Sequence, residues 1–146
     1  MKNVAPYEVR RVRDDGEMDA VLKLRHDVFC AEQGVPEHDE LDGRDSEAIH
    51  LVAVSNGELL GTCRVLMVGN TAQLSRLAVR ASVRRQGIAT ALLNAADSET
   101  LAAGGRRLVL HAQTYARQLY ENAGYRVRGR EFTEAGIEHI AMEKHL

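Results

Sequence analysis

The sequence predicts a single α+β domain over residues 1–146, with a central mixed β-sheet of about six to seven strands flanked by about four helices. Two observations lead to this fold class. Segments with strand and helix periodicity follow one another in the order strand, helix, three strands, helix, strand, helix and two strands. A chain of 146 residues with 45% hydrophobic residues, 27% charged residues and two prolines also suits one compact core.

The first predicted elements are a strand and an amphipathic helix. Residues 7–13 alternate in polarity, and apolar residues then recur at helical spacing over 18–29. Arg25 falls on the same apolar stripe of that helix. A buried guanidinium is costly unless it is paired, so we expect Arg25 to bind Glu32 or a carboxylate of the acidic segment 37–45.

Three strands are predicted in the middle of the chain. Two apolar runs, 50–55 and 58–68, are joined by Asn56 and Gly57, a dipeptide typical of a tight hairpin turn. These runs should therefore pair antiparallel. Residues 73–80 form the third strand, after a further turn.

The second half of the chain alternates helices and strands. A helix is predicted over 87–103 and ends at a Gly-Gly pair. A short strand over 107–112 leads to a second helix over 114–123. The last predicted strands are 125–130 and 137–143, which gives the sheet its mixed composition.

Composition argues against several functional classes. A formal net charge of −2 and 4% aromatic residues do not fit a general nucleic-acid binder. The first fifteen residues lack the apolar core of a signal peptide, and no stretch approaches the ~18 apolar residues of a membrane span, so we expect a cytoplasmic protein without a membrane partner. Cys30 and Cys63 should be reduced, and the histidines and cysteines lack zinc spacing, so no metal is predicted.

The most informative segment joins a strand to a helix through a loop rich in hydrogen-bond donors. Arg84, Arg85 and Gln86 lead into Gly87, where free backbone amides and the positive end of the helix dipole coincide. Gly87 allows the backbone to approach an anion, and Ala89 keeps the first turn uncrowded. The two arginines would also suit a solvated turn. Neither a Walker loop nor a dinucleotide glycine motif is present, so we interpret the segment as a different kind of phosphate site.

Arg84, Gly87 and Ala89 match in order the coenzyme A signature of the GNAT superfamily of N-acetyltransferases, and nearly the whole chain resembles that superfamily. Residues 76–79 resemble its splayed central strand, and residues 116–125 resemble its second signature, in which a helix tyrosine precedes a Gly-aromatic pair. Other segments resemble the ElaA-like branch: 24–29, 32–33, 42–45, His50, 136–137 and 139–140.

The resemblance implies acetyl-coenzyme A as cofactor, with its pantetheine arm along the splayed strand and its diphosphate at the helix start. It also implies that Tyr120 gives a proton to the leaving thiolate, although periodicity alone would place this tyrosine in the core. Gln113 stands where the family often has an asparagine that touches the pantetheine. The implied cofactor-binding residues are Leu77, Ala78, Val79, Arg84, Arg85, Gln86, Gly87, Ile88, Ala89, Thr90 and Gln113.

Attack by an amine also needs a base, for which the family has no fixed residue. The candidates are Glu37, Glu40, Asp42, His111 and His139. We select His111 as the second catalytic residue because imidazole is suited to proton transfer near neutral pH and because this residue ends a strand near the expected cleft. A surface or hydrogen-bonded core role stays open for each histidine.

The acidic segment 37–45 could attract a cationic acceptor or could be a solvated loop. The predicted acceptor-binding residues are Arg25, Glu37, Asp42 and His139. The sequence thus predicts an acetyl-coenzyme A-dependent N-acetyltransferase that acts on a primary amine of a small molecule by direct attack in a ternary complex. The alternative is a non-catalytic acyl-coenzyme A sensor or protein-interaction module. By analogy with relatives, an edge strand near residues 137–142 could pair across a two-fold axis to form a homodimer.

Overall fold

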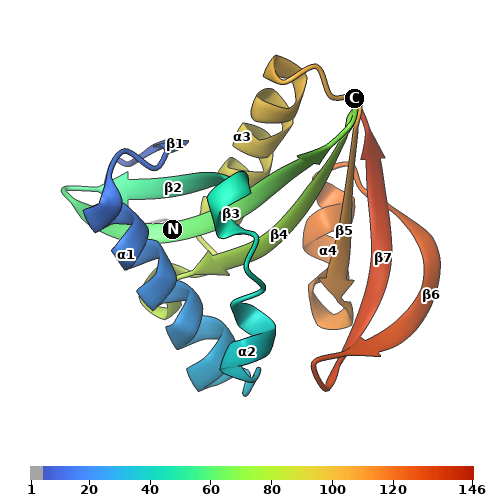
Figure 1. The fold of residues 1–146 in the computed structure, drawn as a ribbon, viewed down its shortest axis with the longest axis horizontal. Coiled ribbons are helices and arrows are strands. Elements are labelled where there is room, and N and C mark those ends of the chain that lie inside the picture. Colours follow the sequence, from blue (N-terminus) through green and yellow to red (C-terminus); the bar gives the residue numbers. More distant parts are fainter. Residues whose placement is uncertain (1–4) are drawn as a thin grey trace.

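The computed structural model describes residues 5–146, so the first four residues of the N-terminal segment considered above lie outside it. Its seven strands form one sheet in the order β1-β2-β3-β4-β5-β7-β6 (Figure 1). All neighbouring strands are antiparallel except β4 and β5, which are parallel, so the predicted mixed sheet is confirmed. The strands are β1 (Glu8–Arg11), β2 (Ile49–Ser55), β3 (Glu58–Val68), β4 (Thr71–Val79), β5 (Arg107–Gln113), β6 (Arg126–Glu134) and β7 (Ile137–His145).

Helices cover both sides of the sheet. The helices α1 and α2 lie on one side, and α3 and α4 lie on the other (Figure 1). No helix within residues 5–146 has the length and apolar character needed to cross a bilayer. The α-helices are α1 (Asp15–Arg25), α2 (Glu37–Glu40), α3 (Ile88–Ala102) and α4 (Arg117–Asn122), and short 3₁₀ turns occupy Asp45–Glu47, Ala81–Val83 and Thr114–Ala116.

The central hairpin forms as predicted. Strands β2 and β3 pair antiparallel, and Ser55 opposes Glu58 across the turn. Asn56 and Gly57 adopt φ angles of 50° and 76°, the left-handed conformation that a two-residue turn of this kind requires. A local sequence signal therefore sets the register of these two strands.

Two apolar cores hold the helices against the sheet. On the α3 side the fully buried Leu92 belongs to the larger core, while Val21 of α1 packs with Val52 of β2 in the smaller core on the opposite face. A Cβ atom at Gly61 of β3 would lie 3.1 Å from side-chain carbons of Ile88 and Leu92. This glycine therefore lets α3 pack close to β3.

The first helix changes its geometry before it ends. Instead of one 3.6-residue periodicity over 18–29, α1 ends at Arg25 and continues as a π-helix over His26–Glu32. The Gln33 amide donates to the Val28 carbonyl, five residues back, at 3.2 Å. The wider turn brings Glu32 and Gln33 to the wall of the main cleft of the protein.

The route predicted for a homodimer is wrong. Strand β7 lies between β5 and β6, so residues 137–142 are inside the sheet rather than at an edge. The reason is that β7 pairs with β5 along its whole length, from Arg107 opposite His145 to Gln113 opposite His139, while β6 folds back onto its other side. The edge strands are β1 and β6.

Candidate active site

The central feature of the site is an opening between β4 and β5. The parallel ladder joins only residues 71–73 to residues 107–109, and beyond it the two strands diverge (Figure 1). Within the described residues 5–146, residues 74–79 of β4 therefore have no strand partner on the side that faces β5. Backbone N–H and C=O groups along such an edge can pair with an extended ligand.

A bulge in β4 accompanies the divergence. The register with β3 shifts between Thr62 and Arg64, and Arg76 adopts a left-handed φ of 58°, which is uncommon for a residue with a side chain. The Arg76 guanidinium donates to the carbonyl of Asp39 at 3.3 Å and to that of Glu40 at 2.9 Å. Side-chain bonds to the α2 region thus help to hold the bulge.

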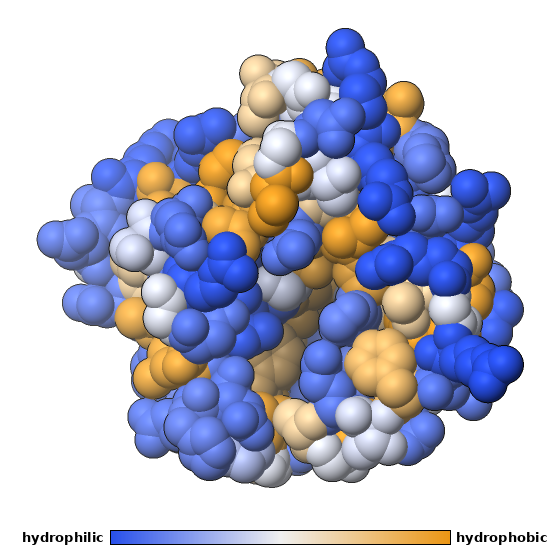
Figure 2. All heavy atoms as spheres, turned by 45° about the vertical axis from the view of Figure 1, so that its right-hand side comes forward, coloured by the Kyte–Doolittle hydropathy of each residue, from blue (hydrophilic) through white to orange (hydrophobic). Residues whose placement is uncertain are grey.

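The opening continues into a cleft of about 1250 Å³. Figure 2 shows a face of the molecule that is hollowed near its centre, with hydrophobic residues inside the hollow and hydrophilic residues around it. Arg25, Glu37 and Gln86 are outside the cleft lining. The other predicted site residues line it together: Leu77, Ala78, Val79, Arg84, Arg85, Gly87, Ile88, Ala89, Thr90, Gln113, Tyr120, His111, Asp42 and His139.

The loop before α3 presents backbone amides at one end of the cleft. Arg85 and Gly87 have φ angles of 62° and 88°, and the Ala91 amide donates to the Gly87 carbonyl at 3.1 Å to close the first helical turn. Amides before that bond have no acceptor within the helix. Together with the helix dipole they form a site suited to an anion.

The two neighbouring arginines of this loop differ in their contacts. Arg84 donates to both carboxylate oxygens of Glu32, at 2.8 and 2.9 Å, and to the Val79 carbonyl at 2.9 Å. The hydrogen bonds from Arg84 lower the pKa of Glu32. Arg84, predicted as a phosphate ligand, therefore joins the loop to the π-helix. Arg85 lines the cleft and makes no hydrogen bond or ion pair within residues 5–146.

Tyr120 reaches the cleft from α4. Its side chain is largely buried and packs edge-on against Tyr125, with ring centroids 5.9 Å apart. Burial raises the pKa of Tyr120 above its ordinary value near 10, so the phenol is protonated at neutral pH. Its hydroxyl has no hydrogen-bond partner in the described part of the chain, which leaves it available to a ligand.

His111, Glu134 and His139 gather on the β5 and β7 side of the cleft. His111 Nδ1 lies 3.0 Å from Glu134 Oε1, and His139 Nε2 lies 3.8 Å from Glu134 Oε2. The other ring nitrogen of His139 bonds to the Ile137 carbonyl at 2.7 Å. The ring of Phe132 contacts both imidazoles, edge-on with His111 and stacked with His139. The candidate base thus has a carboxylate partner that the sequence interpretation did not include.

A glutamine pair spans the opening. Gln113, predicted to contact the pantetheine, donates from Nε2 to Gln33 Oε1 at 2.8 Å. Gln33 in turn donates to the Tyr115 hydroxyl at 3.3 Å. Because Glu32 contacts the loop before α3, two successive residues at the end of the π-helix reach both walls of the opening.

Arg25 belongs to a buried group of ion pairs. Its Nε and Nη2 atoms donate to the two carboxylate oxygens of Glu40 at 2.6 and 2.9 Å, and Nη1 donates to Asp45 at 2.8 Å. These contacts confirm the expected pairing with the acidic segment. Arg25 is 0% exposed and does not line the cleft, so the structure does not place it with the predicted acceptor site.

The rest of the acidic segment is also engaged with the sheet. Asp42 receives hydrogen bonds from Arg64 at 2.7 and 2.8 Å and has Arg76 at 3.4 Å. The contact with Arg64 chiefly holds the pKa of Asp42 far below its ordinary range. Glu37 is exposed outside the cleft, so the structure does not place it with the acceptor site.

Sequence reasoning missed Glu134, Gln33 and Arg76. Glu134 lies between the two last predicted strands, and the Ala135-Gly136 turn fixes the hairpin register that carries it. Gln33 and its partner Gln113 are 80 residues apart, and nothing local indicates their contact. The left-handed conformation of Arg76 also has no local signal, since arginine does not favour it.

Comparisons with known proteins agree with this architecture. Residues 18–146 match the family model described as an acetyltransferase (GNAT) domain. YjcF of Bacillus subtilis, an N-acetyltransferase by name, is 31% identical over 133 residues, covering 90% of this chain and 95% of that protein. The crystal structure of Escherichia coli ElaA superposes with a TM-score of 0.85 at 23% identity, over 95% of this chain and 99% of that chain.

One further structure of the same fold contains a ligand. An aminoglycoside 6'-N-acetyltransferase complexed with coenzyme A superposes with a TM-score of 0.75 at 19% identity. The match covers 94% of this chain and 96% of that chain. At this identity, and at that of ElaA, the likeness is one of fold.

Proposed function

Because this chain belongs to the GNAT acetyltransferase family and is an acyltransferase, we propose that it transfers an acetyl group from acetyl-coenzyme A to a primary amine of a small molecule, by direct attack in a ternary complex. The opening between β4 and β5 carries the proposal. It leads from the amides at the start of α3 to the unpaired hydroxyl of Tyr120. Such an opening suits a long ligand with an anionic end, a chain of amides and a reactive thioester.

Two parts of the chain would hold the coenzyme. The amides of residues 87–90 and the free guanidinium of Arg85 would bind its diphosphate, while Arg84 keeps the loop in place. The backbone of residues 77–79 would pair with the pantetheine amides as an added strand. The coenzyme A complex of a protein with the same fold supports this assignment. When bound, the coenzyme supplies an activated thioester.

Two side chains would handle protons. Tyr120, kept protonated by burial, gives a proton to the departing sulfur. His111 accepts a proton from the amine, whose deprotonation at pH 7 costs about 4 to 5 kcal/mol for a lysine-like pKa. A backbone amide of residues 77–79 would stabilise the developing negative oxygen by about 3 to 4 kcal/mol.

The acceptor would enter from the side of the sheet that carries α1 and α2. His139 and Asp42 line the cleft there, although the charge of Asp42 is balanced by Arg64. A cleft of about 1250 Å³ has to hold both the coenzyme arm and the acceptor. That volume favours a small amine over the surface of a folded protein.

Thiol release from acetyl-coenzyme A across a panel of small amines tests the proposal. Tyr120→Phe should lower kcat by about 100-fold through loss of the general acid. Tyr125→Phe is the matched control. The Tyr125 hydroxyl is buried, has no hydrogen-bond partner among the described residues and is outside the cleft, so kcat should stay unchanged. Tight binding of acetyl-coenzyme A in calorimetry with no turnover on any amine would instead favour a non-catalytic acyl-coenzyme A module.

A further inference from the structure

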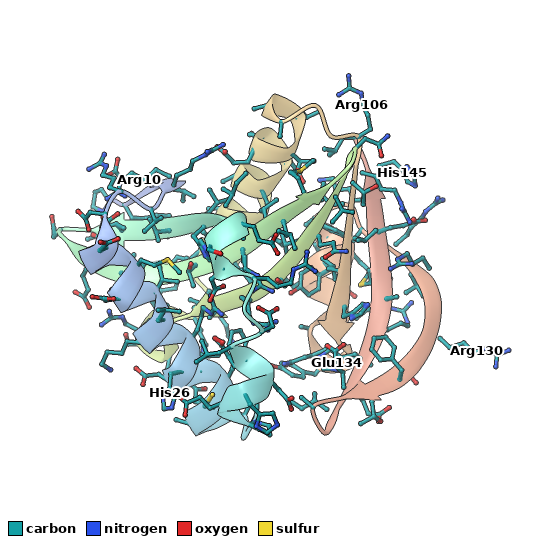
Figure 3. The ribbon with its side chains drawn as sticks, viewed as in Figure 1. Arg10, His26, Arg106, Arg130, Glu134 and His145 are labelled. Atoms are coloured by element: carbon teal, nitrogen blue, oxygen red, sulfur yellow. The ribbon has the colours of Figure 1, made fainter. Side chains whose placement is uncertain are left out.

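We propose that Glu134 is a positioning residue that fixes His111 in the tautomer able to accept the proton of the acceptor amine, an inference that rests on the proposed acetyl transfer. Glu134 Oε1 lies 3.0 Å from Nδ1 of His111, and both residues line the cleft. Figure 3 places Glu134 beside the end of β5, on the side toward α2. No other carboxylate bonds to His111 in the described part of the chain.

The chemistry of the pair decides which nitrogen is the base. An ionised carboxylate can only accept hydrogen bonds, so the shared hydrogen belongs to Nδ1 of His111. The lone pair is then on Nε2, the nitrogen that faces away from Glu134. The carboxylate also stabilises the imidazolium that forms when Nε2 takes a proton, which is the role of the acidic member of a catalytic triad.

The hairpin that carries Glu134 holds the carboxylate in a defined place. Glu134 is the last residue of β6 and opposes Ile137 across the two-residue turn of Ala135 and Gly136. Both turn residues have positive φ angles, 50° and 77°, as a tight hairpin turn requires. Phe132, on the same strand, packs edge-on against His111 with ring centroids 4.9 Å apart. The carboxylate and the imidazole therefore do not depend on a flexible loop to meet.

His139 does not replace His111 in this arrangement. Its Nδ1 hydrogen is held by the Ile137 carbonyl, and its Nε2 lies 3.8 Å from the second oxygen of Glu134. The other charged groups that line this region are Arg128 on β6, and Arg76 and Asp42 on the opposite wall. His111 differs from His139 in position, because it is the first residue on its face of β5 beyond the last β4–β5 pair at Val109.

The proton transfers balance in this arrangement. The acceptor ammonium first releases one proton to solvent, and as the neutral amine nitrogen bonds to the thioester carbon, Nε2 of His111 takes a second proton from that nitrogen. The electron pair of the broken carbon–sulfur bond goes to sulfur, and the Tyr120 hydroxyl gives the sulfur its proton. The imidazolium then releases a proton to solvent, and the phenolate takes one from solvent.

Glu134→Gln tests the proposal against Glu138→Gln, a control on the same hairpin. Within residues 5–146 the Glu138 side chain bonds only to Thr133. Both variants remove one negative charge and keep the size of the side chain. We expect Glu134→Gln to lower kcat by about tenfold, with the KM for acetyl-coenzyme A unchanged and Glu138→Gln within about twofold of wild type.

Nitrogen NMR of the imidazole rings gives a readout that does not need turnover. His111 should carry its hydrogen on Nδ1 at pH 8 in the wild type and in Glu138→Gln, and lose that preference in Glu134→Gln. An unchanged tautomer, or a Glu134→Gln enzyme with wild-type kcat, overturns the proposal. Absence of turnover by the wild type on every amine refutes the proposed function instead, and the two failures are thus distinct.

Discussion

Replacing Arg25 by Met should destabilise the fold strongly, because this change leaves a buried carboxylate without its cation. Arg25 makes three charge-assisted hydrogen bonds of 2.6 to 2.9 Å, and its side chain and that of Glu40 are 1% and 4% exposed. Three such bonds are worth roughly 1.5 to 3 kcal/mol each in isolation, but desolvation of the charges offsets much of this. We expect a loss of about 3 to 5 kcal/mol in the free energy of unfolding.

The double variant Arg25→Met/Glu40→Leu separates charge from packing. If the uncompensated carboxylate causes the loss, removing it should recover more than half of the stability, because apolar side chains can replace a buried ion pair at little cost. Asp45 keeps a cation in both variants, since Arg64 bonds to it at 3.0 Å. Urea unfolding at pH 7, with unchanged m-values, gives the comparison. Lys23→Met, which breaks an exposed pair with Asp27, should cost only about 0.5 kcal/mol.

The reasoning would be refuted by either of two results. A double variant as unstable as Arg25→Met alone would show that shape, and not the unpaired charge of Glu40, accounts for the loss. An Arg25→Met variant no less stable than Lys23→Met would show that the buried pair adds nothing beyond a surface contact.

Three further predictions concern pH, thiol reactivity and coenzyme binding. Arg64 lowers the pKa of Asp42 in the folded state, so the ionised carboxylate stabilises the fold at pH values above its ordinary pKa near 3.8. This stabilisation is lost as the pH falls through the lower folded-state pKa. Asp42→Asn should therefore reduce the free energy of unfolding in urea at pH 7, and the difference from wild type should shrink below about pH 4. Burial raises the pKa of the Cys63 thiol to about 12. A thiol reagent at pH 8 should therefore label Cys30 alone in the native protein and both cysteines in urea. Labelling of both thiols in the native protein would contradict the buried position of Cys63. Gly87→Ala should weaken coenzyme A binding by about tenfold in calorimetry, because a residue with a side chain at φ 88° costs about 1 to 2 kcal/mol. An unchanged affinity would contradict the proposal that the loop before α3 binds the coenzyme.

Local rules in the sequence were sufficient for most of the architecture. The hairpin at Asn56 and Gly57 and the end of α3 near Gly104 follow from residues that tolerate left-handed conformations. The loop before α3 was also predictable, because the start of a helix offers free amides whatever packs around it. Each of these features depends on a few neighbouring residues, so the sequence pattern carries it directly.

Features that depend on distant contacts were not predictable in the same way. The position of β7 inside the sheet depends on a register between Leu110 and Met142, which no short pattern encodes. The same applies to the pairing of His111 with Glu134, which are 23 residues apart. Arg84 shows the limit most clearly. Its motif suits a phosphate ligand, but Glu32 lies close enough in the fold to take its guanidinium.

The opening between β4 and β5 needs structural support because two adjacent strands could gain ladder hydrogen bonds, about 1 kcal/mol each, by closing together. Two features of the chain oppose that closure. Arg76 takes a left-handed conformation that breaks the regular strand and is tied by its side chain to the carbonyls of the α2 region. Glu32 and Gln33 reach opposite walls of the opening from one helix end. The buried Arg25–Glu40 ion pair is therefore linked to the opening, because the carboxylate of Glu40 binds Arg25 while its backbone carbonyl accepts a hydrogen bond from Arg76.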